Sequence, residues 1–236
     1  MIGTVRDIMI DRGPYVSFAN CGLPYYVGNV ISDERRLLVA SREMFHERFN
    51  IDVRTDTEVT AIDRNAGTIA IRDVHTGSVG IEHYDALVLS PGAAPIRPPL
   101  PGIDLPGVFA VRTIPDSRLI RSWITEHNAK TAVVIGGGFI GLEMVENLIH
   151  RKLSVSILEK LSQVMPPLDP EMAVPLMEHL AANGVPLHLG DGLARIEEHD
   201  GGGLVVIAES GARFPADLVI LAIGVRPETM RAVARH

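Results

Sequence analysis

A glycine-rich turn between an apolar strand and a helix is the feature that most constrains the fold of this chain. The short apolar, β-branched run Thr131–Ile135 leads directly into Gly136-Gly-Gly-Phe-Ile-Gly141. Apolar residues then recur at helical spacing from Leu142 to Ile149, and a second apolar run, Leu153–Leu158, ends at Glu159. A strand, a G-x-G-x-x-G turn, a helix and a strand ending in an acid predict a βαβ unit that binds a dinucleotide.

Each glycine of this turn has its own physical role. Gly136 permits the tight turn, Gly138 lets the backbone approach a pyrophosphate, and Gly141 allows the helix to pack closely on the strand. The N-terminus of the following helix attracts phosphate charge. Glu159 would accept hydrogen bonds from a ribose diol and repel a 2′-phosphate, which favours NADH over NADPH, although the adjacent Lys160 weakens that preference. The alternative is a glycine-rich turn that binds nothing.

The residues after Glu159 continue the α/β pattern. A helix is predicted from about Pro170 to Asn183, with Asp169 as its N-cap and Gly184 as its stop. A strand is predicted from Val185 to Gly190. The stretch from Ala194 to Phe214 alternates apolar and polar residues around a glycine triplet, which predicts antiparallel strands joined by a hairpin turn.

An internal repeat shows that the chain contains two related halves. Asp85–Pro95 matches Asp217–Pro227, with glycine seven and proline ten positions after the aspartate in both copies, and both predict a buried strand leading into a glycine turn. Asp11 likewise corresponds to Glu159, because each closes an apolar segment. The last glycine of the turn lies 18 residues before Glu159, and a turn at that offset from Asp11 would fall before residue 1. We therefore expect an α/β chain of two Rossmann-like, three-layer domains, the first incomplete.

A proline-rich segment, Pro95–Gly102, is stiff and poor in backbone donors, as expected of a connection between domains. It predicts a first, truncated domain over residues 1–101, a dinucleotide-binding domain over residues 102–227, and a tail over residues 228–236. Two halves of this size agree with the usual length of domains.

Composition excludes several classes of partner and site. The formal net charge of −7 offers no positive footprint for nucleic acid. No apolar run approaches the roughly 20 residues that span a bilayer, and charges interrupt the start of the chain before a signal peptide can form. We therefore expect a cytoplasmic protein without membrane contact. With one cysteine, Cys21, neither an intrachain disulfide nor a cysteine-built metal site is possible, and no metal site is predicted.

Two further sets of residues are ambiguous on pattern alone. Glu143 and Glu146 follow the glycine turn on the predicted helix, where they could contact a cofactor or simply stabilise the helix N-terminal turn. Cys21 lies in a loop entering a helix, where it could be a reactive thiol or a buried small hydrophobe.

The segment around the cysteine supplies a resemblance. Gly13-Pro-Tyr-Val-Ser-Phe-Ala-Asn-Cys-Gly-Leu-Pro-Tyr-Tyr-Val-Gly28 resembles the redox-cysteine segment of coenzyme A disulfide reductases and the related single-cysteine NADH oxidases and persulfide reductases. These enzymes belong to the pyridine nucleotide-disulfide oxidoreductase superfamily. The similarity continues through both copies of the repeat, the glycine turn and Asp169-Pro-Glu-Met172, and so covers nearly the whole chain.

The resemblance implies an FAD-dependent oxidoreductase in which NADH reduces FAD and the flavin passes electrons to Cys21. A single cysteine has no protein thiol to resolve it, so the partner sulfur or oxygen must come from the acceptor: coenzyme A disulfide, another disulfide, a persulfide, peroxide or oxygen. Family positions that touch coenzyme A match Ser17, Asn20 and Arg48. Positions on the nicotinamide side match Gly136, Gly138, Phe139, Ile140, Gly141, Glu143, Glu159 and Gly224, and those on the FAD side match Asp11, Val59, Ser90, Pro91 and Gly92.

The sequence also departs from the family pattern. The family's first strand, its own glycine turn for the FAD pyrophosphate and the following helix have no match, and neither has the C-terminal dimerisation domain. Two hypotheses follow: a flavin-dependent reductase with Cys21 as its redox centre, or a non-catalytic NADH-binding fragment that cannot hold flavin. Apolar surface left exposed by the unmatched parts would favour a homo-oligomer.

Overall fold

The computed structural model describes residues 6–229 of the 236-residue chain, and these form two compact units. Among the described residues, the first unit comprises Arg6–Ala19, Arg35–Ala93 and Pro227–Thr229. The second comprises Asn20–Glu34 and Ala94–Arg226. This grouping differs from the division by sequence near Gly102, because the short segment that carries Cys21 packs with the second unit. The predicted tail at residues 228–236 lies largely outside the described residues.

A five-stranded parallel sheet organises the second unit, with the strand order β12-β11-β10-β16-β9. The central strand β10 (Thr131–Ile135) lies between β11 (Ser154–Glu159) and β16 (Leu218–Leu221). The two edges are β12 (Leu187–Leu189) and β9 (Val108–Ala110). The predicted strands on either side of the glycine turn are therefore confirmed.

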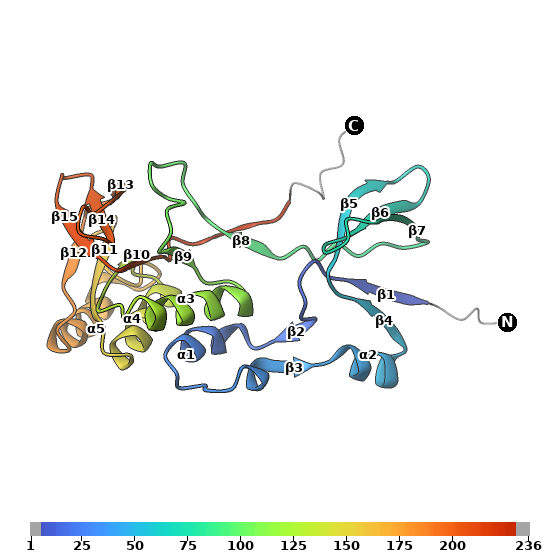
Figure 1. The fold of residues 1–236 in the computed structure, drawn as a ribbon, viewed down its shortest axis with the longest axis horizontal. Coiled ribbons are helices and arrows are strands. Elements are labelled where there is room, and N and C mark those ends of the chain that lie inside the picture. Colours follow the sequence, from blue (N-terminus) through green and yellow to red (C-terminus); the bar gives the residue numbers. More distant parts are fainter. Residues whose placement is uncertain (1–5, 230–236) are drawn as a thin grey trace. The chain divides into compact units, whose positions relative to one another are not determined.

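Helices cover one face of this sheet, and an antiparallel sheet covers the other, which gives three layers (Figure 1). The helices are α3 (Ile114–Glu126), α4 (Phe139–His150) and α5 (Pro170–Ala182). The antiparallel sheet, predicted as a hairpin region, consists of β13 (Leu193–Glu198), β14 (Leu204–Ala208) and β15 (Arg213–Ala216).

The core of the second unit lies between the two sheets. Alternate residues of β10, Val133 and Ile135, face the antiparallel sheet, where Val206 is fully buried among them. The intervening residue Val134 is also fully buried, as expected for a parallel strand covered on both faces. On the helical side α3 begins at a capping box, in which Thr113 and Asp116 each satisfy a backbone N–H of the other.

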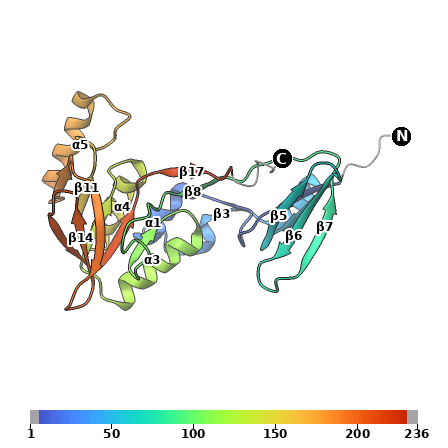
Figure 2. The ribbon, with the colours of Figure 1, turned by 90° about the horizontal axis from the view of Figure 1, so that it is seen from above.

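The first unit holds shorter sheets (Figure 2). Strands β1 (Asp7–Ile10) and β4 (Ile51–Arg54) form a parallel pair. Strands β5 (Thr57–Asp63), β6 (Thr68–Asp73) and β7 (Val79–His83) form an antiparallel meander. The remaining elements are β2 (Ser17–Phe18), paired with β3 (Leu38–Ala40), and helix α2 (Arg42–Phe49). The chain passes between the units after Ala19, after Glu34, and within β8 (Ala93–Pro95) and β17 (Val225–Pro227), two strands that pair with each other.

The prediction of a buried strand in the first copy of the repeat is wrong. Residues 85–92 form no strand, and Leu87, Val88 and Leu89 are 36%, 86% and 48% exposed. The second copy forms the fully buried β16 as predicted. The two copies differ in strand pairing. Strand β16 pairs with β10 on one side and β9 on the other, whereas residues 86–89 pair with no strand in the described part of the chain.

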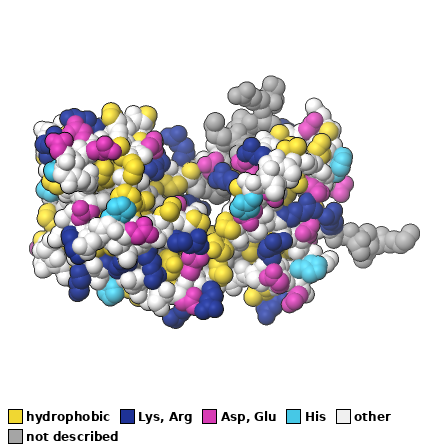
Figure 3. Space-filling model, viewed as in Figure 1, with side chains coloured by type: hydrophobic (Ala, Val, Ile, Leu, Met, Phe, Trp, Pro, Cys, Tyr) yellow, Lys and Arg dark blue, Asp and Glu magenta, His cyan; other side chains and the backbone are white. Residues whose placement is uncertain are grey.

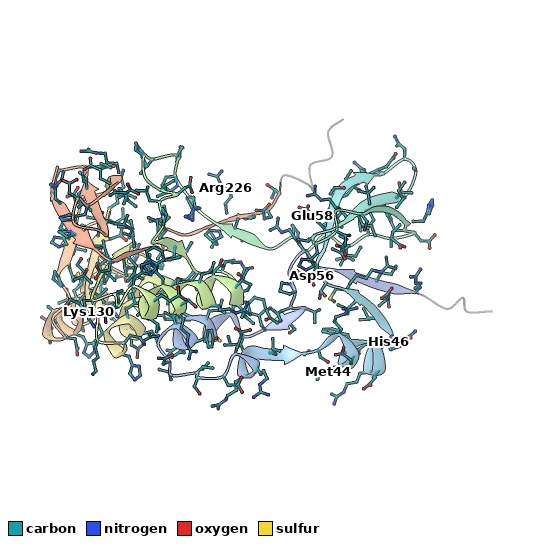
Figure 4. The ribbon with its side chains drawn as sticks, in the orientation of Figure 1. Met44, His46, Asp56, Glu58, Lys130 and Arg226 are labelled. Atoms are coloured by element: carbon teal, nitrogen blue, oxygen red, sulfur yellow. The ribbon has the colours of Figure 1, made fainter. Side chains whose placement is uncertain are left out.

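Asp217, at the start of β16, joins this strand to the central strand. Its carboxylate accepts hydrogen bonds from the backbone N–H groups of Lys130 (2.7 Å) and Thr131 (2.8 Å) and from the Thr131 hydroxyl (2.9 Å). Lys130 is labelled in Figure 4. Burial opposes ionisation of Asp217, but the hydrogen bonds outweigh it and lower its pKa overall.

We predict that Asp217→Asn lowers the free energy of unfolding by about 1–3 kcal/mol at pH 7, because it replaces a charged acceptor that satisfies several donors. The lowered pKa of Asp217 stabilises the folded protein at pH values above the ordinary pKa of 3.8. The free energies of unfolding of Asp217→Asn and of the unmodified protein should therefore converge as the pH falls below that value. The measurement is urea unfolding between pH 2.5 and 7. Asp85→Asn, at the equivalent repeat position, is the control and should change stability little, and equal losses in both variants would contradict this account.

Candidate functional site

The glycine turn between β10 and α4 has the geometry that its sequence predicts. Gly136 has a φ of +105°, and a Cβ there would lie 2.5 Å from the Ala222 carbonyl oxygen. A Cβ at Gly141 would collide with the Gly136 carbonyl oxygen, so this glycine allows α4 to pack on the strand. A Cβ at Gly138 would meet nothing within 4 Å, and Gly138 is the N-cap of α4. The turn thus leaves open space where backbone N–H groups and the helix N-terminus can receive a phosphate.

Glu159, at the end of β11, is bound to the glycine turn. Its Oε2 accepts a hydrogen bond from Gly137 N–H at 2.7 Å, and its Oε1 accepts one from Leu161 N–H at 2.8 Å. The residue is only 8% exposed. These two bonds fix the carboxylate beside the turn, and each oxygen keeps further acceptor capacity for a ribose hydroxyl. Lys160, the neighbour expected to weaken the NADH preference, forms an exposed ion pair with Glu209 at 2.9 Å instead.

The remaining nicotinamide-side positions differ in exposure. Phe139 and Ile140, at the start of α4, are 65% and 37% exposed, so both present apolar surface beside the turn. Gly224 has a φ of +106°, and its carbonyl oxygen accepts a hydrogen bond from Ile96 N–H. Glu143 is half-buried on α4; burial, and then the adjacent charge of Glu146, raises its pKa.

Cys21 is an exposed free thiol, so it is not a buried hydrophobe. It lies in a 3₁₀ turn, η1 (Asn20–Gly22), that leads into the short helix α1 (Leu23–Val27). This helix packs against α3 and α4. The contact with α4 requires Gly28, because a Cβ there would collide with the Asn147 side chain.

Basic side chains of α3 and of the residue after α4 bind the cysteine segment, residues 20–34, to the rest of the second unit. Arg118 donates two hydrogen bonds to the Glu34 carboxylate, at 2.9 and 2.6 Å, and the Tyr26 hydroxyl donates a third at 3.2 Å. Arg121 lies over the Tyr26 ring, 4.5 Å from its centroid, and Arg151 donates to the Val27 carbonyl oxygen at 3.1 Å. The sequence analysis did not identify these contacts. The one sequence feature that could have indicated them is the pair Arg118 and Arg121 on the helix before the glycine turn.

A further arginine reaches the residue beside the cysteine. Arg112 Nη1 donates to Asn20 Oδ1 at 3.1 Å. The Arg112 backbone N–H is in turn bound by the carboxylate of Asp116, 3.1 Å away, in the capping box of α3. The side of the segment nearest α4 is acidic: the charge of Glu146, then burial and the charge of Glu143, raises the pKa of Tyr25.

The FAD-side and coenzyme A positions are distributed over the first unit, except Asn20. Asp11 follows β1, and its Oδ1 accepts a hydrogen bond from Gly13 N–H at 2.6 Å. Ser17 lies in β2, Arg48 is exposed on α2 and Val59 lies in β5. Ser90, Pro91 and Gly92 are exposed and belong to no strand. The structure thus brings the nicotinamide-side residues together in one unit, but within the first unit it builds no comparable site from the FAD-side residues.

Residues 6–229 were also examined for clusters of metal-binding side chains and for long apolar helices. No cluster of three or more His, Cys, Asp or Glu residues suited to a metal ion occurs there. Within the same range, no helix has both the length and the apolar character to cross a bilayer. On the face shown in Figure 3, basic and acidic side chains are interspersed.

Comparison with known proteins gives consistent matches over nearly the whole chain. The family model described as pyridine nucleotide-disulphide oxidoreductase matches residues 4–235. The solved structure of reduced Bacillus anthracis CoADR-RHD is 46% identical with a TM-score of 0.92, over 96% of this chain and 40% of that one. An NAD-dependent persulfide reductase from A. fulgidus is 36% identical with a TM-score of 0.89, over 95% of this chain and 42% of its own.

A curated NADH oxidase from Methanocaldococcus jannaschii is 35% identical over 93% of this chain and 49% of its own. The chain spans about half the length of the curated relatives that it matches.

We predict that Arg118→Gln increases the mobility of the cysteine segment. The substitution removes an ion pair with two hydrogen bonds to Glu34, whose side chain is only 24% exposed. The expected cost is about 0.5–1 kcal/mol, and amide hydrogen exchange in residues 20–34 should accelerate. Arg213→Gln, which removes a single 3.3 Å contact with Glu197, is the matched control and should leave the segment unchanged. Unchanged exchange in Arg118→Gln would show that the arginine does not hold the segment.

We predict that Glu143→Gln raises stability at neutral pH by a few tenths of a kcal/mol, because the folded protein disfavours the charged form of this half-buried carboxylate. A raised pKa in the folded state means that the unmodified protein gains stability as the pH falls. The difference between the two proteins should therefore disappear below the ordinary pKa of 4.5. Thermal unfolding at pH 4, 6 and 8 tests this, and a difference that grows on acidification would refute it.

Proposed function

This chain belongs to the pyridine nucleotide-disulphide oxidoreductase family, and on that premise we propose that it binds NADH at the glycine turn and carries in Cys21 the redox nucleophile of a disulfide reductase. The observation that carries the proposal is the presence of two features in the second unit. One is a glycine turn fixed by the buried Glu159, and the other is the exposed, anchored cysteine.

The residues of the second unit fit a dinucleotide. Gly138 leaves space for a pyrophosphate at the N-terminus of α4, a helix of 12 residues. The fixed carboxylate of Glu159 suits a ribose diol and repels a 2′-phosphate, so NADH is preferred over NADPH. When bound, NADH supplies a hydride, and this chain's residues hold and orient it.

Cys21 would react as a thiolate with a small disulfide. Its sulfur attacks one sulfur of the substrate, a mixed disulfide forms between protein and substrate, and the other half leaves as a thiolate. We propose coenzyme A disulfide or a related disulfide, persulfide or oxygen species as the acceptor, with Ser17, Asn20 and Arg48 as coenzyme A contacts. The names of similar proteins support this range: CoADR-RHD, persulfide reductase and NADH oxidase.

The described residues of the first unit do not fit FAD. Residues 86–89 form no strand, and Ser90–Gly92 after them lie exposed. No glycine turn followed by a helix, the feature that would receive the pyrophosphate, occurs among these residues. For this polypeptide by itself we therefore propose NADH binding without flavin-dependent turnover, and we derive no step through flavin.

Gly138→Ala tests the nucleotide site sharply. A Cβ at this position meets no protein atom, so the thermal midpoint should stay within about 1 °C, yet it occupies the space of the pyrophosphate and should weaken NADH binding by roughly tenfold or more. NADH fluorescence titration is the measurement, with NADPH as the weaker ligand. Gly80→Ala on β7, whose Cβ makes ordinary contact with Ile71, is the control. Equal NADH affinity in all three proteins would refute the site.

The visible absorption spectrum tests the redox part. After incubation with FAD and desalting, the protein should be colourless, and addition of NADH without oxygen should produce no spectral bleaching. The opposite result would be a retained flavin band that NADH bleaches and that coenzyme A disulfide restores. If Cys21→Ser abolished this restoration, the chain would be shown to act as a flavin-dependent reductase.

A further inference from the structure

Helix α1 begins two residues after Cys21, and its C-terminal carbonyl oxygens need partners from outside the helix. The backbone that follows α1 supplies three of these partners, all of them N–H groups within residues 28–31. The next two carbonyl oxygens, those of Val27 and Gly28, are bound by side chains from the end of α4. The C-terminal end of α1 is therefore tied to another helix.

Two adjacent residues at the end of α4 make these contacts. Arg151, the C-cap of α4, donates from Nη1 to the Val27 oxygen at 3.1 Å. The Nδ1 of His150, the last residue of α4, lies 2.8 Å from the Gly28 oxygen. A carbonyl oxygen only accepts, so this Nδ1 carries a proton and donates it. Basic side chains commonly bind the last carbonyl oxygens of a helix, and here they come from a different helix.

A third residue of α4 sets how closely α1 approaches. Asn147 is 1% exposed, and its Nδ2 donates to the Glu143 carbonyl oxygen at 2.8 Å, which holds the side chain in place. A Cβ at Gly28 would lie 2.2 Å from Asn147 Oδ1. Asn147, His150 and Arg151 have the i, i+3, i+4 spacing that places side chains on one face of a helix. One face at the end of α4 thus holds the end of α1.

Cys21 lies at the opposite end of α1. The side chains of Leu23 and Val27 are buried, so apolar packing fixes which face of α1 is turned to the core. The contacts at the Val27 and Gly28 oxygens fix the helix along its axis. A helix of five residues spans only about 7.5 Å, so a shift at its C-terminal end is transmitted to the thiol.

We propose that His150 is a positioning residue for Cys21. Together with Arg151 it holds the C-terminal end of α1, and it thereby keeps the thiol where a bound disulfide can be attacked along its S–S axis. This inference rests on the proposed redox function of Cys21. It gives α4 two tasks, because the first turn of this helix belongs to the proposed nucleotide site and its last turn holds the cysteine segment.

A direct acid–base role for His150 fits the contacts less well. A base that takes the proton of a thiol must lie within hydrogen-bond reach of the sulfur. The Nδ1 of His150 is engaged at Gly28, which follows Cys21 by seven residues at the far end of α1. The side chain that contacts Asn20, beside Cys21, is that of Arg112.

The stoichiometric reaction of the full chain with coenzyme A disulfide tests the proposal without flavin or NADH. The Cys21 thiolate attacks one sulfur and the S–S bond breaks. Half of the substrate stays on the protein as a mixed disulfide, and the other half leaves as coenzyme A thiolate. Mass spectrometry measures the adduct, and thiol release gives the rate. We expect His150→Phe, which keeps a ring but loses the donor, to lower the rate at saturating disulfide by roughly three- to tenfold. The half-saturating concentration should stay within about twofold.

The matched variants separate positioning from a general loss of structure. His150→Asn places a side-chain N–H where Nδ1–H lies and should recover about half of the lost rate or more. His179→Phe, in the last turn of α5, is the control and should react like the unmodified chain. Alkylation of Cys21 by iodoacetamide needs no aligned partner and should stay within about twofold in every variant. An unchanged disulfide rate in His150→Phe, equal losses in the Phe and Asn variants, or a parallel loss in alkylation would each overturn the proposal.

A second readout keeps this inference separate from the proposed function. An unmodified chain that forms no adduct would contradict coenzyme A disulfide as the acceptor, and amide hydrogen exchange in residues 20–28 then decides the role of His150. Exchange there should accelerate by about threefold or more in His150→Phe and return toward the unmodified rate in His150→Asn. Unchanged exchange in His150→Phe would overturn the positioning role, whatever the acceptor.

Discussion

The backbone hydrogen bonds of one central strand hold the second unit together. Strand β10 pairs on both sides. At its two ends, the carboxylates of Asp217 and Glu159 accept hydrogen bonds from the backbone N–H groups of Thr131 and Gly137. A buried parallel strand can exist only when these groups are satisfied, because unpaired backbone donors and acceptors away from water are costly. The open glycine turn depends on the same strand, since β10 delivers the chain to Gly136 and the helix that follows starts at Gly138.

The first unit shows what the same pattern does without such a strand. The sequence Asp85-Ala-Leu-Val-Leu is a continuous apolar run like its counterpart in β16, although it has one β-branched residue where β16 has two, and the pattern predicts a strand in both. Only the second copy, which lies between β10 and β9, forms a strand. Strand formation is set by pairing more than by intrinsic preference, so a sequence pattern predicts a strand only on condition that its partners exist.

The features that the sequence predicted correctly have short-range causes. The glycine turn, the helix after Asp169 and the antiparallel strands around Gly201–Gly203 all follow from residues close to one another in the chain. The anchoring of the cysteine segment has a long-range cause. Arg118 and Glu34 are 84 residues apart, and nothing in the sequence around either residue identifies its partner. For the same reason the grouping of residues 20–34 with the second unit was not predicted from the proline-rich connection.

The grouping of Cys21 with the nicotinamide unit has a consequence for the chemistry. The cysteine segment is contacted at three places: Arg112, just before α3, donates to Asn20, Arg118 of α3 pairs with Glu34, and Asn147 of α4 lies close to Gly28. None of these three contacts involves the first unit. The glycine turn and the cysteine segment thus belong to one packed unit, so the nucleotide binding and the thiol chemistry that we propose for them depend on the folding of the same core.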